Sequence, residues 1–378
     1  MPSPSSPHSP SAHPARGPSR RDASEPERTR RLRRQRLTAL GVLVAVGVAL
    51  AVLIAGARST SPARVSRREI ATGRDEHAGS ASAAAGTRTR PAGPFATGHI
   101  VLRFADHTRL IKLPDGKTVP RTLDTYIRYP ALGSDSRSDL RDAPAARGAA
   151  PFPLIVFGHG FAVTPTLYTR LLRAWAQAGY VVASPVFPLA NANAPGGPNE
   201  SDLPNQPADM RVVISRMLAA SNAPSGPLSG LIAQRQIAVA GQSDGGDAAL
   251  AVAYDPRFRD PRVGAAMILS GAEIPGIGGF QIPPGGPPLL ATQGTADTIN
   301  PPSATNGYYD SAPRPKYLLE LLGASHLPPY STEAPQLGVV ERVTIAFLDH
   351  YLKHTRGSLR RLRTAGSVAG VATLNSHP

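Results

Sequence analysis

Residues 237–250 read IAVAGQSDGGDAAL, and this stretch decides the expected fold. It begins with a short apolar run that is typical of a buried strand, and it ends with small and apolar residues at helical spacing. Between the two parts stands Ser243, with Gly241 and Gly245 two residues away on either side. A serine on a sharp strand-to-helix turn has a strained backbone, and only small neighbours leave room for it. The stretch predicts a nucleophile at a helix N-terminus, where the helix dipole favours an oxyanion.

By itself this pattern also fits a small residue in a tight turn, so the rest of the chain has to decide. From about residue 97, short runs that are apolar throughout alternate with amphipathic stretches, which is typical of a parallel sheet covered by helices on both faces. Two early runs, GHIVLRF and RTLDTYIRYP, flank the turn signal LPDGK and are expected to be antiparallel strands. We expect one α/β domain over residues 94–355, with about eight strands in a mostly parallel sheet.

Two later strands are expected to end in an acid and a base. Asp297 follows the run PLLATQG by three residues, and His326 follows YLLELLG by three residues. A serine hydroxyl becomes a good nucleophile when an imidazole takes its proton, and a carboxylate fixes the tautomer of that imidazole. The chain order Ser243, Asp297, His326 is that of α/β-hydrolases. These three residues are the predicted catalytic triad, with Asp310 as the alternative acid.

The run PLIVF is followed by residues 158–161, Gly-His-Gly-Phe, which predict an oxyanion loop. A tetrahedral intermediate needs two preorganised N–H donors. We expect these donors to be the backbone N–H groups of Phe161 and of Asp244, the residue after the nucleophile. His159 is expected to order this loop through hydrogen bonds rather than to react.

Residues 97–352 resemble the α/β-hydrolase group that contains platelet-activating-factor acetylhydrolases, bacterial polyester hydrolases and chlorophyllase-like esterases. The resemblance rests on RTLDTYIRYP, FGHGF, NQPADMR, the GQSDG elbow, GTADTINPP and GASHLPPY, which stand in the order familiar from that group. It implies an α/β-hydrolase fold for the domain and hydrolysis of carboxylic esters through an acyl-enzyme. Gln242 and Asp244 stand where relatives often carry His and an apolar or aromatic residue. Residues 272–280 lack the tryptophan that polyester hydrolases commonly have there, so polyester is not the expected substrate.

Two long loops on the expected active-site side, 188–206 and 272–288, are predicted to shape the substrate pocket. The second loop contains four apolar side chains, which suggest that the pocket takes an acyl or other hydrophobic group: Ile274, Ile277, Phe280 and Ile282. No cofactor and no metal are expected. His350 and His354 have the spacing of two ligands on one helix face, but they lack a third.

Almost all of the formal net charge of +15 lies outside the predicted catalytic domain. Residues 1–36, 58–93 and 353–378 carry +6, +4 and +5, so residues 94–352 are neutral. A basic patch on the domain would suggest nucleic-acid binding, and the even balance argues against it. Residues 1–36 are expected to be a disordered cytoplasmic tail, 58–93 a flexible stalk and 356–378 a basic C-terminal tail.

Residues 37–57, LTALGVLVAVGVALAVLIAGA, carry no charge over a length that spans a bilayer as a helix. We interpret this segment as a transmembrane signal-anchor, because the apolar core of a cleaved signal is shorter. The alternative is cleavage after Ala55-Gly56-Ala57 and secretion. The excess of Arg before the segment favours a cytoplasmic N-terminus and a catalytic domain outside the cytoplasm, on a single-pass membrane protein.

The sequence therefore predicts a membrane-anchored serine hydrolase that cleaves small-molecule or lipid-like esters. A peptidase or a dienelactone-type hydrolase would use the same residues, and an inactive hydrolase fold that serves as a binding module is a further alternative. The oligomeric state is left open.

Overall fold

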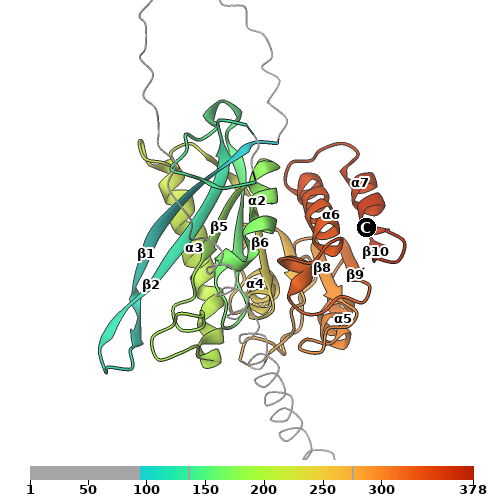
Figure 1. Cartoon of the computed structure of the whole chain (residues 1–378). Coiled ribbons are helices and arrows are strands. Elements are labelled where there is room, and N and C mark those ends of the chain that lie inside the picture. The colour runs from blue at the N-terminus through green and yellow to red at the C-terminus, as the bar shows by residue number, and fades with distance from the viewer. Residues whose placement is uncertain (1–93, 135–136, 275) are drawn as a thin grey trace, which may run out of the picture. The chain divides into compact units, whose positions relative to one another are not determined.

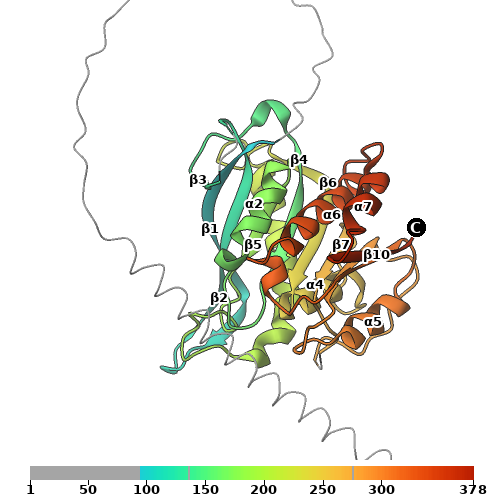
Figure 2. The same ribbon diagram turned by 45° about the vertical axis from the view of Figure 1, so that its right-hand side comes forward.

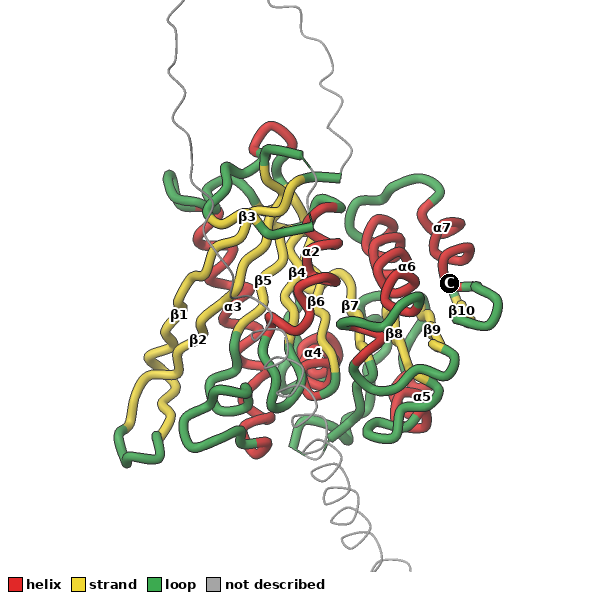
Figure 3. Tube along the Cα trace, viewed as in Figure 1, coloured by secondary structure: helices red, strands yellow, loops and turns green. Residues whose placement is uncertain are grey.

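The computed structural model describes residues 94–134, 137–274 and 276–378. They form a ten-stranded sheet in the order β10-β9-β8-β7-β6-β4-β5-β2-β1-β3 (Figure 1). The strands, yellow in Figure 3, are β1 (Ala96–Lys112), β2 (Thr118–Ala131), β3 (Leu140–Arg141), β4 (Phe152–Gly158), β5 (Val181–Pro185), β6 (Ile232–Gln242), β7 (Val263–Leu269), β8 (Leu289–Gly294), β9 (Lys316–Leu321) and β10 (Ala372–His377).

The helices fill the crossovers between the strands. They are η1 (Arg147–Ala149), η2 (Pro165–Tyr168), α2 (Thr169–Gln177), η3 (Glu200–Asn205), α3 (Gln206–Asn222), α4 (Asp244–Tyr254), α5 (Pro302–Ser311), η4 (Pro328–Tyr330), α6 (Gln336–Tyr351) and α7 (Ser358–Gly366). The six strands from β4 to β9 are parallel, and β2 is antiparallel to both β1 and β5. The mixed α/β fold with a mostly parallel sheet agrees with the prediction, although the sheet has ten strands rather than about eight.

The predicted C-terminal tail, 356–378, is wrong: its residues belong to the folded domain. They form α7, which packs on α6, and β10, which pairs antiparallel with β9 along its whole length. Leu362 and Ala372 are buried, while Arg360, Arg361 and Arg363 remain exposed. The positive charge therefore lies on the outer face of an amphipathic helix. The prediction was based on the net charge of the segment, which does not reveal the apolar face of that helix. The domain predicted to end at residue 355 extends to β10.

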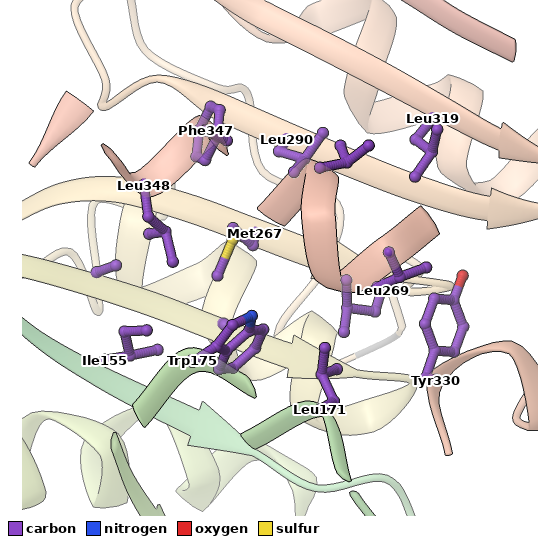
Figure 4. Close-up of a cluster of buried hydrophobic side chains, with 14 of the residues drawn as sticks. Ile155, Leu171, Trp175, Met267, Leu269, Leu290, Leu319, Tyr330, Phe347 and Leu348 are labelled. Carbon is purple, nitrogen blue, oxygen red and sulfur yellow. The ribbon is translucent and has the colours of Figure 1, made fainter. Parts of the chain in front are cut away.

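The core lies between the sheet and helices on its two faces. Figure 2 shows α2, α6 and α7 on the same side of the sheet, and the side chains between them gather around Trp175 (Figure 4). The Trp175 indole N–H donates to Thr344 Oγ1 at 2.9 Å, which joins α2 to α6 without leaving a buried donor unpaired. Alternate residues along each strand point to the other face, where α3 and α4 pack. With both faces covered, the central parallel strands β4, β5, β7 and β8 are buried along almost their whole length.

A buried ion cluster fastens β2 to the 188–206 loop. Arg121, 1% exposed, donates Nε to Asp209 Oδ1 at 2.7 Å and Nη1 to Asp202 Oδ1 at 2.8 Å. Arg109 reaches Asp209 Oδ1 at 2.8 Å and Asp106 Oδ2 at 2.6 Å. Hydrogen bonds from Thr108 and Arg109 outweigh partial burial and lower the pKa of Asp106 to about 2. The cluster holds the loop after β5 at the active-site edge of the sheet.

Within the described part of the chain, no helix combines the length and the apolar character that a membrane crossing requires. The predicted transmembrane segment 37–57 lies outside the described residues, as do the predicted tail 1–36 and stalk 58–93.

The buried cluster generates a stability prediction. We expect Arg121→Met to lower the free energy of unfolding by about 3–5 kcal/mol, because it leaves two buried carboxylates without their main partner. Urea unfolding followed by circular dichroism measures this change. Arg103→Met is the matched control, since Arg103 pairs with Asp124 on the surface, and its unfolding midpoint should stay close to that of the wild type. Equal midpoints for the two variants would contradict the stabilising role of the cluster.

Candidate active site

Ser243 stands on a sharp turn between β6 and α4. Its backbone has φ 54° and ψ −127°, a conformation that side-chain-bearing residues rarely adopt. The glycines of the motif allow the turn to be this tight. A Cβ on Gly241 would lie 2.0 Å from the carbonyl oxygen of Gly245, and one on Gly245 would lie 2.2 Å from the carbonyl of Gly158. Three segments of backbone therefore touch one another at the elbow, and only glycine fits at these two positions.

The three residues predicted as a triad come together. His326 Nε2 lies 2.8 Å from Ser243 Oγ, and His326 Nδ1 lies 2.7 Å from Asp297 Oδ2. Ser243, Asp297 and His326 are 6%, 3% and 5% exposed, so their polar contacts are largely shielded from water. Hydrogen bonding of Nδ1 to the carboxylate leaves Nε2 as the acceptor for the serine proton. The arrangement can activate a serine hydroxyl.

The loop after β8 holds the carboxylate of Asp297 in place. Asp297 Oδ1 accepts the backbone N–H groups of Ile299 and Asn300, both at 2.9 Å, and Gln293 Nε2 lies 3.3 Å from Oδ2. These hydrogen bonds fix the rotamer of the Asp297 side chain. Asp310, the alternative acid, is exposed on α5, and the structure places Asp297 rather than Asp310 against the imidazole.

The predicted oxyanion loop runs directly beside the serine. A Cβ on Gly160 would lie 3.3 Å from the Cβ of Ser243. This contact brings the loop that carries Phe161 next to the N-terminus of α4, where the N–H of Asp244 is located. The loop is also tied to the segment after β5, because Ala162 donates its N–H to the carbonyl of Ala190 at 2.8 Å. Both segments thus border the same site.

The side chain of His159 forms hydrogen bonds with both of these segments. Its Nδ1 donates to the carbonyl of Gly160 at 2.7 Å, and its Nε2 accepts the N–H of Phe187 at 3.0 Å. Burial lowers the pKa of His159 to about 4, so the ring is neutral near pH 7 and has the tautomer that these contacts require. His159 orders the loop, as expected, and is not placed against the serine.

Residues 132–261 match the family model of chlorophyllase. The matched range contains the oxyanion loop and Ser243, and it ends before Asp297. No curated protein matches the sequence. The match agrees with the resemblance to the chlorophyllase-like group, and the sheet order and the serine elbow agree with the match. The chain has the fold of an α/β-hydrolase.

Several polar residues of this hydrolase that the sequence analysis did not single out support the triad. The hydroxyl of Tyr330 contacts Ser270 Oγ at 2.9 Å and accepts from Thr292 Oγ1 at 3.1 Å, and Asn300 Nδ2 donates to the carbonyl of Ser270 at 2.7 Å. Gln293 donates to the carbonyl of Asn300 at 2.9 Å. The sequence did contain a signal for such residues. A polar residue at the end of an otherwise apolar strand indicates the edge of the sheet where the site lies.

The two long loops of the hydrolase meet, and their contact corrects the predicted apolar lining. Ile277 is 1% exposed and packs in a small cluster with Leu203 and Ala251, against which Ile274 also packs. Phe280 and Ile282 stay half-buried. The first two isoleucines therefore hold the loops together, and Phe280 and Ile282 lie outside this cluster.

A groove of about 600 Å³ lies between residues of β1 and β2, the segment around Thr164 and the loop after β5. Its lining includes Tyr126 of β2, Thr164, Pro188 and Asn193. Across the described residues, no group of three or more His, Cys, Asp or Glu side chains is arranged to hold a metal ion.

The elbow generates a prediction on its glycines. We expect Gly245→Ala to destabilise the hydrolase by about 1–3 kcal/mol, because its Cβ would meet the backbone of Gly158. Gly307→Ala on α5 is the matched control: its Cβ meets nothing within 4 Å, so the change should be neutral or stabilise the helix by about 0.5–1 kcal/mol. Thermal unfolding measures both variants, and an unchanged Gly245→Ala protein would show that the elbow tolerates a side chain.

Proposed function

We propose that the protein is a serine hydrolase that cleaves carboxylic esters through an acyl-enzyme formed on Ser243. One observation carries the proposal: Ser243 Oγ, His326 and Asp297 form a continuous chain of contacts at 2.8 and 2.7 Å. The serine also stands at positive φ beside a glycine-rich loop, which is the arrangement that exposes a nucleophile to an acyl carbon.

The reaction follows from these positions. His326 Nε2 takes the proton from Ser243 Oγ as the oxygen attacks the ester carbonyl, and Asp297 stabilises the imidazolium that forms. The oxyanion is held by the N–H groups of Phe161 and Asp244. His326 then gives the proton to the leaving alcohol, and water repeats the sequence on the acyl-enzyme to release the acid. The first proton transfer is between Ser243 Oγ and His326 Nε2, which already lie 2.8 Å apart.

Small-molecule or lipid-like esters are the proposed substrates. The proposal of an apolar acyl or alcohol group is supported by the loop 272–288 after β7, which carries Phe280 and Ile282 outside the cluster around Ile277. The carboxyl group of Asp244, next to the nucleophile in sequence, disfavours anionic substrates by charge repulsion.

We further propose that residues 37–57 tether the catalytic domain outside the cytoplasm, as their apolar length suggests. The mass of the mature protein tests this assignment. We expect a mass that includes the N-terminal residues, and a mass that begins after Ala57 would instead show a secreted enzyme.

The proposed nucleophile can be tested directly. Ser243→Ala should lower kcat/KM for a short p-nitrophenyl ester by about 10⁴-fold or more, and it should abolish labelling by a fluorophosphonate probe. The matched control is Ser184→Ala, which removes a buried hydroxyl that only donates to the carbonyl of Phe157. That variant should keep both activity and labelling. Turnover that persists in Ser243→Ala would overturn the proposed function.

A further inference from the structure

We propose that Gln242 is a positioning residue that ties the His326 loop to the oxyanion loop through the hydroxyl of Tyr168. The proposal rests on the proposed function above, because it assigns Gln242 a role in the same reaction. Gln242 is the last residue of β6 and directly precedes the nucleophile.

The side chain of Gln242 contacts both sides of the site. Its Nε2 donates to the carbonyl oxygen of His326 at 3.1 Å. Its Oε1 accepts the hydroxyl of Tyr168 at 2.7 Å, and that hydroxyl in turn accepts the N–H of Gly160 at 3.2 Å. An uninterrupted chain of three hydrogen bonds therefore joins the loop that carries His326 to the oxyanion loop.

The chemistry of the partners fixes the orientation of the amide. The carbonyl of His326 can only accept, so the amide nitrogen of Gln242 must face it. The hydroxyl oxygen of Tyr168 already accepts from Gly160, which leaves its hydrogen to donate to Gln242 Oε1. Every donor in the chain meets an acceptor. Any side chain that lacks either the donor or the acceptor would leave a buried partner unpaired.

Burial and close packing make this link rigid. Gln242 is 1% exposed and Tyr168 is 0% exposed, and burial raises the pKa of the Tyr168 hydroxyl, which keeps it protonated as a donor. A Cβ on Gly160 would lie 2.9 Å from Gln242 Oε1 and 3.3 Å from the Tyr168 hydroxyl. The oxyanion loop is thus seated directly on this pair. A displacement of the pair would move the loop and the base together.

Gln242 also approaches the reacting nitrogen of the base. Its Nε2 lies 3.3 Å from His326 Nε2, the atom that takes the proton of the serine. A carboxylate at the same place would bring a negative charge to this nitrogen, whereas the amide of Gln242 is neutral.

Steady-state kinetics of the full chain with a p-nitrophenyl ester can test the role of Gln242. Gln242→Met keeps the length of the side chain and removes both hydrogen bonds. It should lower kcat by about 10–100-fold through misplacement of the catalytic groups, with KM little changed. Tyr168→Phe should have an effect of the same kind. Tyr317→Phe is the matched control, because it removes a buried hydroxyl that contacts only the hydroxyl of Tyr351, and its kcat should equal that of the wild type.

The double variant Gln242→Met/Tyr168→Phe separates a shared path from two independent effects. If both residues act in one chain, the double variant should lose no more than the worse single variant, whereas independent effects would multiply. Multiplied effects would overturn the proposal. So would a Gln242→Met protein with the kcat of the wild type.

Gln242→Glu provides a readout that a purely structural role would not change. It keeps the acceptor for Tyr168 and places a carboxylate near His326 Nε2, so the acid limb of the kcat/KM profile should move to higher pH. An acid limb at the wild-type position would contradict the proposal. If Ser243→Ala kept the activity of the wild type, the proposed function itself would be overturned. The two failures are therefore distinguishable.

Discussion

The close backbone contact at the serine elbow is the constraint on which the rest of the site depends. Gly241, Gly245 and Gly158 come from the end of β6, the start of α4 and the end of β4, and their main chains touch. This contact allows Ser243 to keep a positive φ, which by itself costs about 1–3 kcal/mol. Hydrogen bonds hold the strained residue, since Ser243 donates its N–H to Leu269 and accepts from the N–H of Asp247, both at 3.0 Å. The same backbone contact therefore positions both Ser243 and the oxyanion loop.

Polar residues at the ends of buried strands hold the other loops of the site in place. Gln242 closes β6, Ser270 follows β7, and Thr292 and Gln293 lie near the end of β8. Each side chain is buried and fastens a loop that leaves the sheet. Because a buried polar group without a partner is costly, these residues select one arrangement of the loops. The ion cluster around Arg121 does the same for the loop after β5.

The parts of the site that the sequence predicted share one property: each is encoded locally. The apolar run before Ser243, its glycines and the order of the acid and the base could all be read along the chain, and Asp297 and His326 do lie in contact. The contacts that were missed join distant segments. Tyr168 meets Gln242 across 74 residues, and Arg121 meets Asp202 across 81 residues. Nothing in the local pattern of either partner indicates the other.

The sequence by itself determined that a strand delivers Ser243 to a sharp turn, that helices cover both faces of a parallel sheet, and that an acid and a base follow later strands. Hydrophobic periodicity and glycine placement are local properties, and they suffice for these conclusions. Only the tertiary structure decided that α7 and β10 belong to the domain, that Ile277 packs between loops and that Gln242 joins the two halves of the site. These features depend on which buried surfaces and polar groups meet once the chain has folded, and distance along the chain does not encode that.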